Sequence, residues 1–173
     1  MIKISRGIFW PSVALFVCLL ATQNAKADKL DDAHRLLKIT DIGEQFELTA
    51  KSQTSDILRT YSSIVVIATD INLPESVKQQ ISYCYFQTYT WDKFEPGIAK
   101  IFADNLSQIE LRLLIDFFSD RSVPPTQIEQ FKNLRKKAPT IEQLSIDFIL
   151  NHSDGCDEHN VELILAYLAS YTS

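Results

Sequence analysis

Apolar residues recur at intervals of three and four along nearly the whole chain. This spacing gathers them on one face of an α-helix, whereas a half-buried strand would alternate apolar and polar residues. Glycine, on which tight hairpin turns and phosphate-binding loops depend, is scarce, and after residue 27 it occurs only as Gly43, Gly97 and Gly155. The sequence therefore predicts an all-α fold, a single-domain bundle of about seven helices.

Proline-containing segments divide this pattern into separate helices. The interruptions are Asn72-Leu73-Pro74, Val123-Pro124-Pro125 and Ala138-Pro139-Thr140, and Glu95-Pro96-Gly97 marks a further start, kink or turn. The predicted helices run from Leu30 to Ile39, from about Gly43 to Asp70, from Pro74 to about Tyr89, up to Asn105, from Ser107 past Phe118, across Ile128 to Leu134, from Thr140 to Leu150, and across Val161 to Tyr171.

Two helix starts carry capping patterns. Ser107 and Glu110 match a capping box, and Thr140 with Gln143 has the same spacing. The helix after Ser107 is apolar on almost every side, so we expect it to be the central one. For the helix from Gly43 to Asp70, the spacing predicts a core face of Ile57, Tyr61, Ile64, Val65 and Ala68.

The N-terminus has the pattern of a secretory signal peptide. Lys3 and Arg6 precede an apolar stretch from Ile8 to Ala21, and Ala25-Lys26-Ala27 supplies small residues for cleavage. The apolar stretch is shorter than the roughly 20 residues that span a bilayer. We expect residues 1–27 to be removed and residues 28–173 to form one helical domain in the periplasm, without a membrane span.

Two alternatives concern the same segment. The first is an uncleaved anchor, against which Pro11 and Ser12 interrupt the apolar stretch. Lipidation at Cys18 would require a small residue before the cysteine, and bulky Val17 stands there. Cleavage at Ala27 is the better-supported prediction.

The balance of charges argues against a nucleic-acid partner. Cleavage would remove Lys3, Arg6 and Lys26, which lowers the basic residues from 17 to 14 against 22 acidic ones and changes the net charge from −5 to −8. Such a chain repels phosphate backbones. The remaining basic cluster, Lys132 to Lys137, falls at the end of a predicted helix, where it complements the helix dipole.

Cys84 and Cys156 are the cysteines that would remain after processing. In an oxidising periplasm they could form a disulfide. Alternatively, Cys84 is an ordinary buried thiol, because it shares an apolar helical stripe with Val77, Ile81 and Thr88. Spacing alone leaves the two possibilities open.

The stretches WDKFEPGIAKIFADNLSQIELRLLIDFFSD and KKAPTIEQLSIDFI resemble the family known as domain of unknown function 2059, which comprises small exported helical proteins. Glu110-Leu111 and Phe117-Phe118 match its Glu-Leu and aromatic pairs, and LLKITDIGEQF is similar to its N-terminal element. Asp120, Arg121 and Val123 stand where the family has Ser, Pro and Gly. The resemblance covers about residues 30–150 and implies a periplasmic all-α domain without an assigned chemistry.

No motif in the sequence predicts catalysis or a cofactor. A nucleophilic triad needs a base, and His34, His152 and His159 are the three histidines, with no G-x-S-x-G elbow near any serine. His34 is expected on the surface. The segment from His152 to His159 also contains Cys156, so these three side chains form an alternative metal site. We predict no metal and no enzyme activity, with this metal site as the alternative.

Aromatic residues gather between residues 83 and 94. One interpretation is a partner-binding surface formed by Tyr85, Tyr89, Trp91 and Phe94, since tyrosine and tryptophan are common at interface hot spots. The other is plain core packing at helical spacing. We expect a non-enzymatic protein-interaction module, such as a chaperone, an inhibitor or an immunity protein, that binds an unknown partner protein or itself.

Overall fold

The computed structural model describes residues 27–120, 122–153 and 155–171. These residues form helices and no strand, which confirms the all-α prediction. A helix at residues 27–39 is followed by α2 (Ile42–Thr69), α3 (Glu75–Thr88), α4 (Trp91–Asn105), α5 (Gln108–Asp120), the 3-10 helix η1 (Pro125–Gln127), α6 (Ile128–Arg135), α7 (Ala138–Asn151) and α8 (Cys156–Tyr171). Apart from Ala27, the predicted signal peptide lies outside the described residues.

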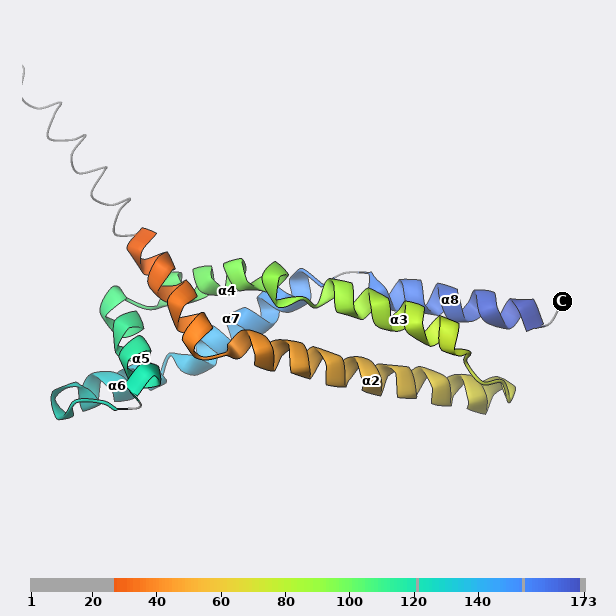
Figure 1. Cartoon of the computed structure of the whole chain (residues 1–173), viewed down its shortest axis with the longest axis horizontal. Helices are drawn as coiled ribbons and strands as arrows, with labels where there is room; N and C mark the ends of the chain where they lie inside the picture. The colour runs from red at the N-terminus through yellow and green to blue at the C-terminus, as the bar shows by residue number, and fades with distance from the viewer. Residues whose placement is uncertain (1–26, 121, 154, 172–173) are drawn as a thin grey trace, which may run out of the picture.

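The molecule is elongated and has two parts (Figure 1). We call the long three-helix part, formed by α2, α3 and α8, the arm. We call the other part, formed by residues 27–39 and α4 to α7, the head. Each part has its own hydrophobic core, and Tyr89, which lies between α3 and α4, packs against both cores. The first turns of α2 also pack on the head, because Phe46 contacts Phe94 and Trp91.

Several helix boundaries follow from the local chemistry. The capping box is confirmed: the Ser107 amide donates to Glu110 Oε2 at 2.7 Å, and the Glu110 amide donates to Ser107 Oγ at 3.3 Å. The cap predicted at Thr140 is wrong, because α7 already begins at Ala138 and has no side-chain cap. Of the start, kink or turn predicted at Glu95-Pro96-Gly97, the start and the turn are wrong, because α4 begins at Trp91 and continues through Pro96.

The prediction that the helix after Ser107 is central is wrong. α5 lies at one end of the molecule beside α6 (Figure 1). It buries Leu111, Leu113 and Ile115 but leaves Ile109 and Phe118 exposed. The head core therefore covers only part of the apolar surface of α5.

The predicted core face of α2 is correct in only one part. Val65 is buried, and Ile57 and Tyr61 are partly buried against α3 and α8. Ile64 and Ala68 are exposed, because the arm has three helices and each neighbour covers only a narrow stripe of α2. In the part of the chain that the structure describes, no helix is both long and apolar enough to cross a membrane.

Candidate functional site

A large apolar cleft lies in the head, where α4, α5, α6 and α7 meet the first turns of α2. Its volume of about 700 Å³ is within the range of about 300–1,000 Å³ that is usual for small-molecule sites. The side chains that line it are mostly aliphatic and aromatic: Ile42, Gln45, Phe46, Thr49, Trp91, Ile98, Phe102, Leu106, Leu114, Phe118, Phe131, Leu134, Arg135, Ala138, Ile141, Glu142, Ser145, Ile146 and Ile149.

The cleft has a buried floor and an exposed rim. Ile98, Leu106 and Leu134 on the floor are almost completely buried and belong to the head core. Phe118 and Ile146 on the rim are exposed. A ligand in the cleft would therefore cover apolar side chains that water contacts in the isolated protein, which favours binding.

One face of α4 forms the length of the cleft. Trp91, Ile98, Phe102 and Leu106 are spaced seven, four and four residues apart, so they lie on one side of the helix. They extend from the first residue of α4 to the residue after its last turn, about 22 Å at 1.5 Å per residue. The cleft is thus an elongated groove along the helix.

Trp91 forms one end of the groove and is held there by its neighbours. Its ring packs against Phe46 with centroids 5.7 Å apart. A Cβ atom at Gly43 would lie 2.6 Å from Trp91 Cδ1, so a larger residue at position 43 would displace the indole. Glycine therefore allows α2 to approach Trp91 closely at this point.

The hydroxyl groups in the cleft are occupied within their own helices. Thr49 Oγ1 donates to the Gln45 carbonyl at 2.7 Å, and Ser145 Oγ donates to the Ile141 carbonyl at 2.8 Å. Neither hydroxyl bonds to a base, which a catalytic nucleophile would require. Arg135 and Glu142 bring one positive and one negative charge to the exposed rim.

The four predicted partner-binding aromatics have different surroundings. Phe94 and Tyr85 are buried, with 0% and 6% of their surface exposed, so the prediction that they form a contact surface is wrong. Phe94 is a centre of the head core, and Tyr85 belongs to the arm core. Tyr89 is partly buried between the two cores. Trp91 alone of the four lines the cleft.

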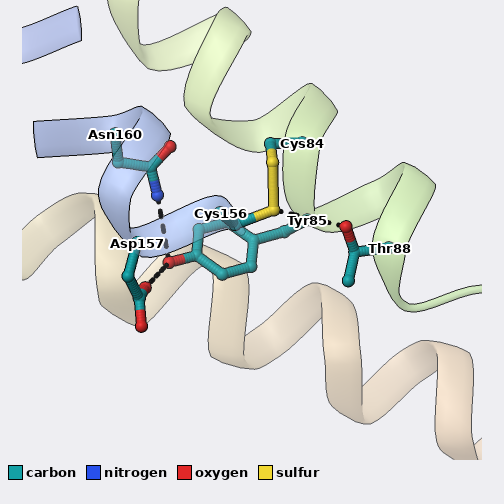
Figure 2. The surroundings of a disulfide bond; sticks show 6 residues. All are labelled: Cys84, Tyr85, Thr88, Cys156, Asp157 and Asn160. Atoms are coloured by element: carbon teal, nitrogen blue, oxygen red, sulfur yellow. Dashed lines mark hydrogen bonds between the residues drawn. A yellow bond between two sulfur atoms is a disulfide. The ribbon is translucent and has the colours of Figure 1, made fainter. Parts of the chain in front are cut away.

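The structure contains the disulfide that the sequence left open. Cys84 on α3 and Cys156 at the start of α8 are joined, with Cα atoms 5.8 Å apart, across 72 residues of sequence (Figure 2). Thr88 Oγ1 lies 3.3 Å from Cys156 Sγ. The bond fixes α8 against α3 near the junction of arm and head.

A partly buried polar network lies beside the disulfide (Figure 2). Tyr85 Oη donates to Asp157 Oδ1 at 2.8 Å and accepts from Asn160 Nδ2 at 3.1 Å. Asn160 is completely buried, and its amide oxygen has no partner among the described residues. Burial, and then the hydrogen bond to Asp157, raise the pKa of Tyr85 well above its ordinary value of 10.0.

The alternative metal site loses its sulfur ligand to the disulfide. Cys156 is bonded to Cys84, and His152 Nδ1 lies 2.7 Å from the Phe148 carbonyl. The segment is also less of a loop than predicted, because α8 begins at Cys156 and carries His159 in the helix. Among the residues that the structure describes, no three His, Cys, Asp or Glu side chains gather as metal ligands do.

A second hollow, of about 610 Å³, also contains Trp91 in its lining, together with several charged side chains. His34 Nδ1 and Glu95 Oε1 are 2.5 Å apart there, although 61 residues separate them in sequence. Arg35, Lys38 and Asp92 complete its lining with Trp91. None of these lining residues has a hydroxyl or thiol that His34 could activate.

No pattern in the sequence indicates that the cleft is a site. Its lining comes from five helices between residues 42 and 149, and each apolar residue by itself matches a core position. Comparison of the chain with known protein families, with curated proteins and with solved structures finds no match. The resemblance to the domain of unknown function 2059 therefore stays a prediction.

Proposed function

We propose that the protein is a non-enzymatic interaction protein that holds an apolar helical segment of a partner protein in the cleft. The observation that carries this proposal is the apolar lining along one face of α4 from Trp91 to Leu106. A groove of about 22 Å matches about four turns of a second helix. Binding of an amphipathic helix in such a groove is a recurring mode of peptide recognition.

The polar groups of the cleft support binding rather than chemistry. Thr49 and Ser145 direct their hydroxyls into their own helices. Arg135 and Glu142 on the rim make no ion pair with another described residue, so they are available to orient a helix that carries opposite charges. Charges at a rim contribute to the choice and orientation of a partner more than to affinity.

We further propose that the protein works in the periplasm after its signal peptide is removed. The Cys84–Cys156 disulfide supports this, because disulfides persist in oxidising compartments. The resemblance to a family of exported helical proteins agrees with it. A chaperone, an inhibitor or an immunity protein would each use such a cleft to hold one segment of another protein.

Site-specific photo-cross-linking in cells tests the proposal. A photoreactive amino acid replaces Ile146 on the rim of the cleft, and a matched control replaces Leu150, which is exposed on the same helix but does not line the cleft. We expect one dominant protein to be captured from position 146 and not from position 150. Mass spectrometry of the linked peptides should identify an amphipathic helix.

A second variant blocks the cleft. Ser145→Trp adds an indole within the groove, and in this background the photoreactive residue at position 146 should capture much less of the partner. Circular dichroism should show unchanged helix content in the blocked variant. Equal capture from positions 146 and 150, or undiminished capture in the blocked variant, would show that the cleft is not the binding site.

A further inference from the structure

α8 is attached to the rest of the protein mainly at its N-terminal end. Of its sixteen residues, only Cys156, Asn160 and Ile164 are buried. The first two belong to the disulfide and to the Tyr85 network, and the other apolar residues of α8 are partly buried or exposed. α8 also packs chiefly on a single neighbour, α3. The bond from Cys156 to Cys84 therefore provides a large share of the attachment of α8.

Gly155, directly before α8, has a backbone that permits this helix to turn. Its φ of +91° lies in the left-handed region, which glycine adopts readily. A Cβ atom placed there would meet nothing within 4 Å, so the space around it is open. Hinges are typically a few residues at the ends of elements, where φ and ψ can change. Gly155 is therefore the position about which α8 would turn if its first turn came free.

The two sulfur atoms of the disulfide have different surroundings. Cys84 is partly exposed, whereas Cys156 is 5% exposed. Thr88 Oγ1 lies 3.3 Å from Cys156 Sγ and is the donor of this hydrogen bond, because a disulfide sulfur carries no proton (Figure 2). An attacking thiolate thus has better access to Cys84, and a thiolate that leaves at Cys156 already has a donor beside it.

The start of α8 has two opposing effects on a thiolate at Cys156. α8 begins at this residue, and the positive end of a helix dipole favours a thiolate. Asp157 and Glu158 lie in the same turn, and their negative charges oppose it. The direction in which the bond opens therefore rests on the exposure of Cys84 and on the hydroxyl of Thr88.

We propose that the Cys84–Cys156 disulfide is a redox latch, which a dithiol opens to release α8 from α3. A thiolate of the dithiol attacks Cys84 Sγ and forms a mixed disulfide, while Cys156 leaves as a thiolate that accepts the hydrogen bond from Thr88. The second thiol of the dithiol then attacks the dithiol's own sulfur in the mixed disulfide, and Cys84 leaves. The dithiol is oxidised to a disulfide, and its two protons pass to the two cysteines. α8 is then free to turn about Gly155.

A reaction with glutathione tests the direction of attack. The full chain is treated with this monothiol, quenched in acid and alkylated, and its peptides are identified by mass spectrometry. Glutathione should be found mainly on Cys84, and the alkyl group on Cys156. A mixed disulfide mainly on Cys156 would overturn the proposal.

Thr88→Val tests the hydrogen bond to the leaving sulfur. The substitution keeps the shape of the side chain and removes its hydroxyl. Dithiothreitol should reduce the disulfide of this variant about tenfold more slowly than that of wild type, since one hydrogen bond to a charged atom is lost. The matched control is Thr90→Val, because Thr90 is also partly buried and makes no side-chain cap hydrogen bond. Wild-type rates for Thr88→Val, or an equal decrease in the control, would overturn the assigned role of Thr88 and with it the proposal.

Hydrogen exchange of the unchanged chain, before and after treatment with dithiothreitol, tests the release of α8. Amides in the second half of α8 should exchange about tenfold faster or more after reduction, whereas those of α4 in the head should change much less. Unchanged exchange in α8, or the same acceleration in α4, would overturn the latch. No substitution is needed, so the result does not depend on the folding of a variant. Because the cleft lies in the head, failure of the latch would leave the proposed function untouched.

Discussion

The ring of Phe148 on α7 lies directly against the backbone of Gly97 on α4, where a Cβ atom would stand 2.0 Å from Cζ. Phe148 also contacts the Phe94 ring edge-on, with centroids 6.4 Å apart. The absent side chain of Gly97 thus lets α4 and α7 pack closely beneath the cleft. Glycine at this position serves packing and is not a helix break.

Gly97→Ala should therefore destabilise the protein. In an exposed helix the change from glycine to alanine stabilises by about 1 kcal/mol. Here the added methyl group must displace Phe148, and overpacking of this kind costs about 1–3 kcal/mol. Urea unfolding followed by circular dichroism measures the difference in free energy of unfolding.

Gly43→Ala is the control for this prediction. Its methyl group would meet the Trp91 ring, which is partly exposed and can move aside. We expect a smaller loss of stability together with a shift in tryptophan emission. Gly97→Ala should leave the protein less stable than Gly43→Ala; the reverse order would mean that Phe148 is not fixed as described.

The architecture could be predicted from the sequence, whereas the cleft could not. Helical spacing and the Ser107–Glu110 capping box are local signals, and both hold in the structure. The exposed side of α5 and the burial of Phe94 depend on which helices become neighbours. Contacts between residues far apart in the sequence decide which helices pack together, and helical spacing carries no information about those contacts.

The pairing of the two cysteines could not be predicted for the same reason. Helical spacing places Cys84 beside Ile81, but only the packing of α8 against α3 brings Cys156 within bonding distance. His34 and Glu95 likewise meet across 61 residues. A disulfide or ion pair between helices far apart in the sequence becomes predictable only once it is known which helices pack against each other.

Removal of the disulfide should weaken the arm. A bond that closes 72 residues restricts the unfolded chain, and loop entropy gives it a stabilisation of about 4 kcal/mol. We expect Cys84→Ser with Cys156→Ser to lower the urea midpoint strongly. Wild-type protein in reductant should show the same shift, and an unchanged midpoint in both samples would contradict a stabilising role.

Tyr85→Phe should destabilise the protein at neutral pH. Without the hydroxyl, Asn160 loses its hydrogen-bond partner and Asp157 loses a donor, which costs about 1–3 kcal/mol. Because the folded-state pKa of Tyr85 is raised above 10.0, its contribution is complete below pH 10 and declines above it. The stability gap between wild type and Tyr85→Phe should therefore narrow above pH 10, and a constant gap would contradict this.

The contribution of Glu110 to stability should depend on pH in the opposite direction to that of Tyr85. Burial would raise its pKa, but the hydrogen bonds from Lys137 and Ser107 outweigh burial and lower the pKa below its ordinary value of 4.5. The contribution is present above pH 4.5 and is lost as pH falls below it. Wild type should thus be more stable than Glu110→Gln at pH 7, with a smaller difference in acid, and an equal difference at both pH values would contradict this.

The most direct test of the binding cleft is the affinity of the partner captured from position 146 for purified variants. Trp91→Ala removes the aromatic end of the groove and should weaken binding tenfold or more, about 1.4 kcal/mol or above. Tyr83→Ala removes an exposed aromatic on α3 outside the cleft and should bind as wild type does. Equal affinity of Trp91→Ala and wild type, with both proteins folded, would contradict the account.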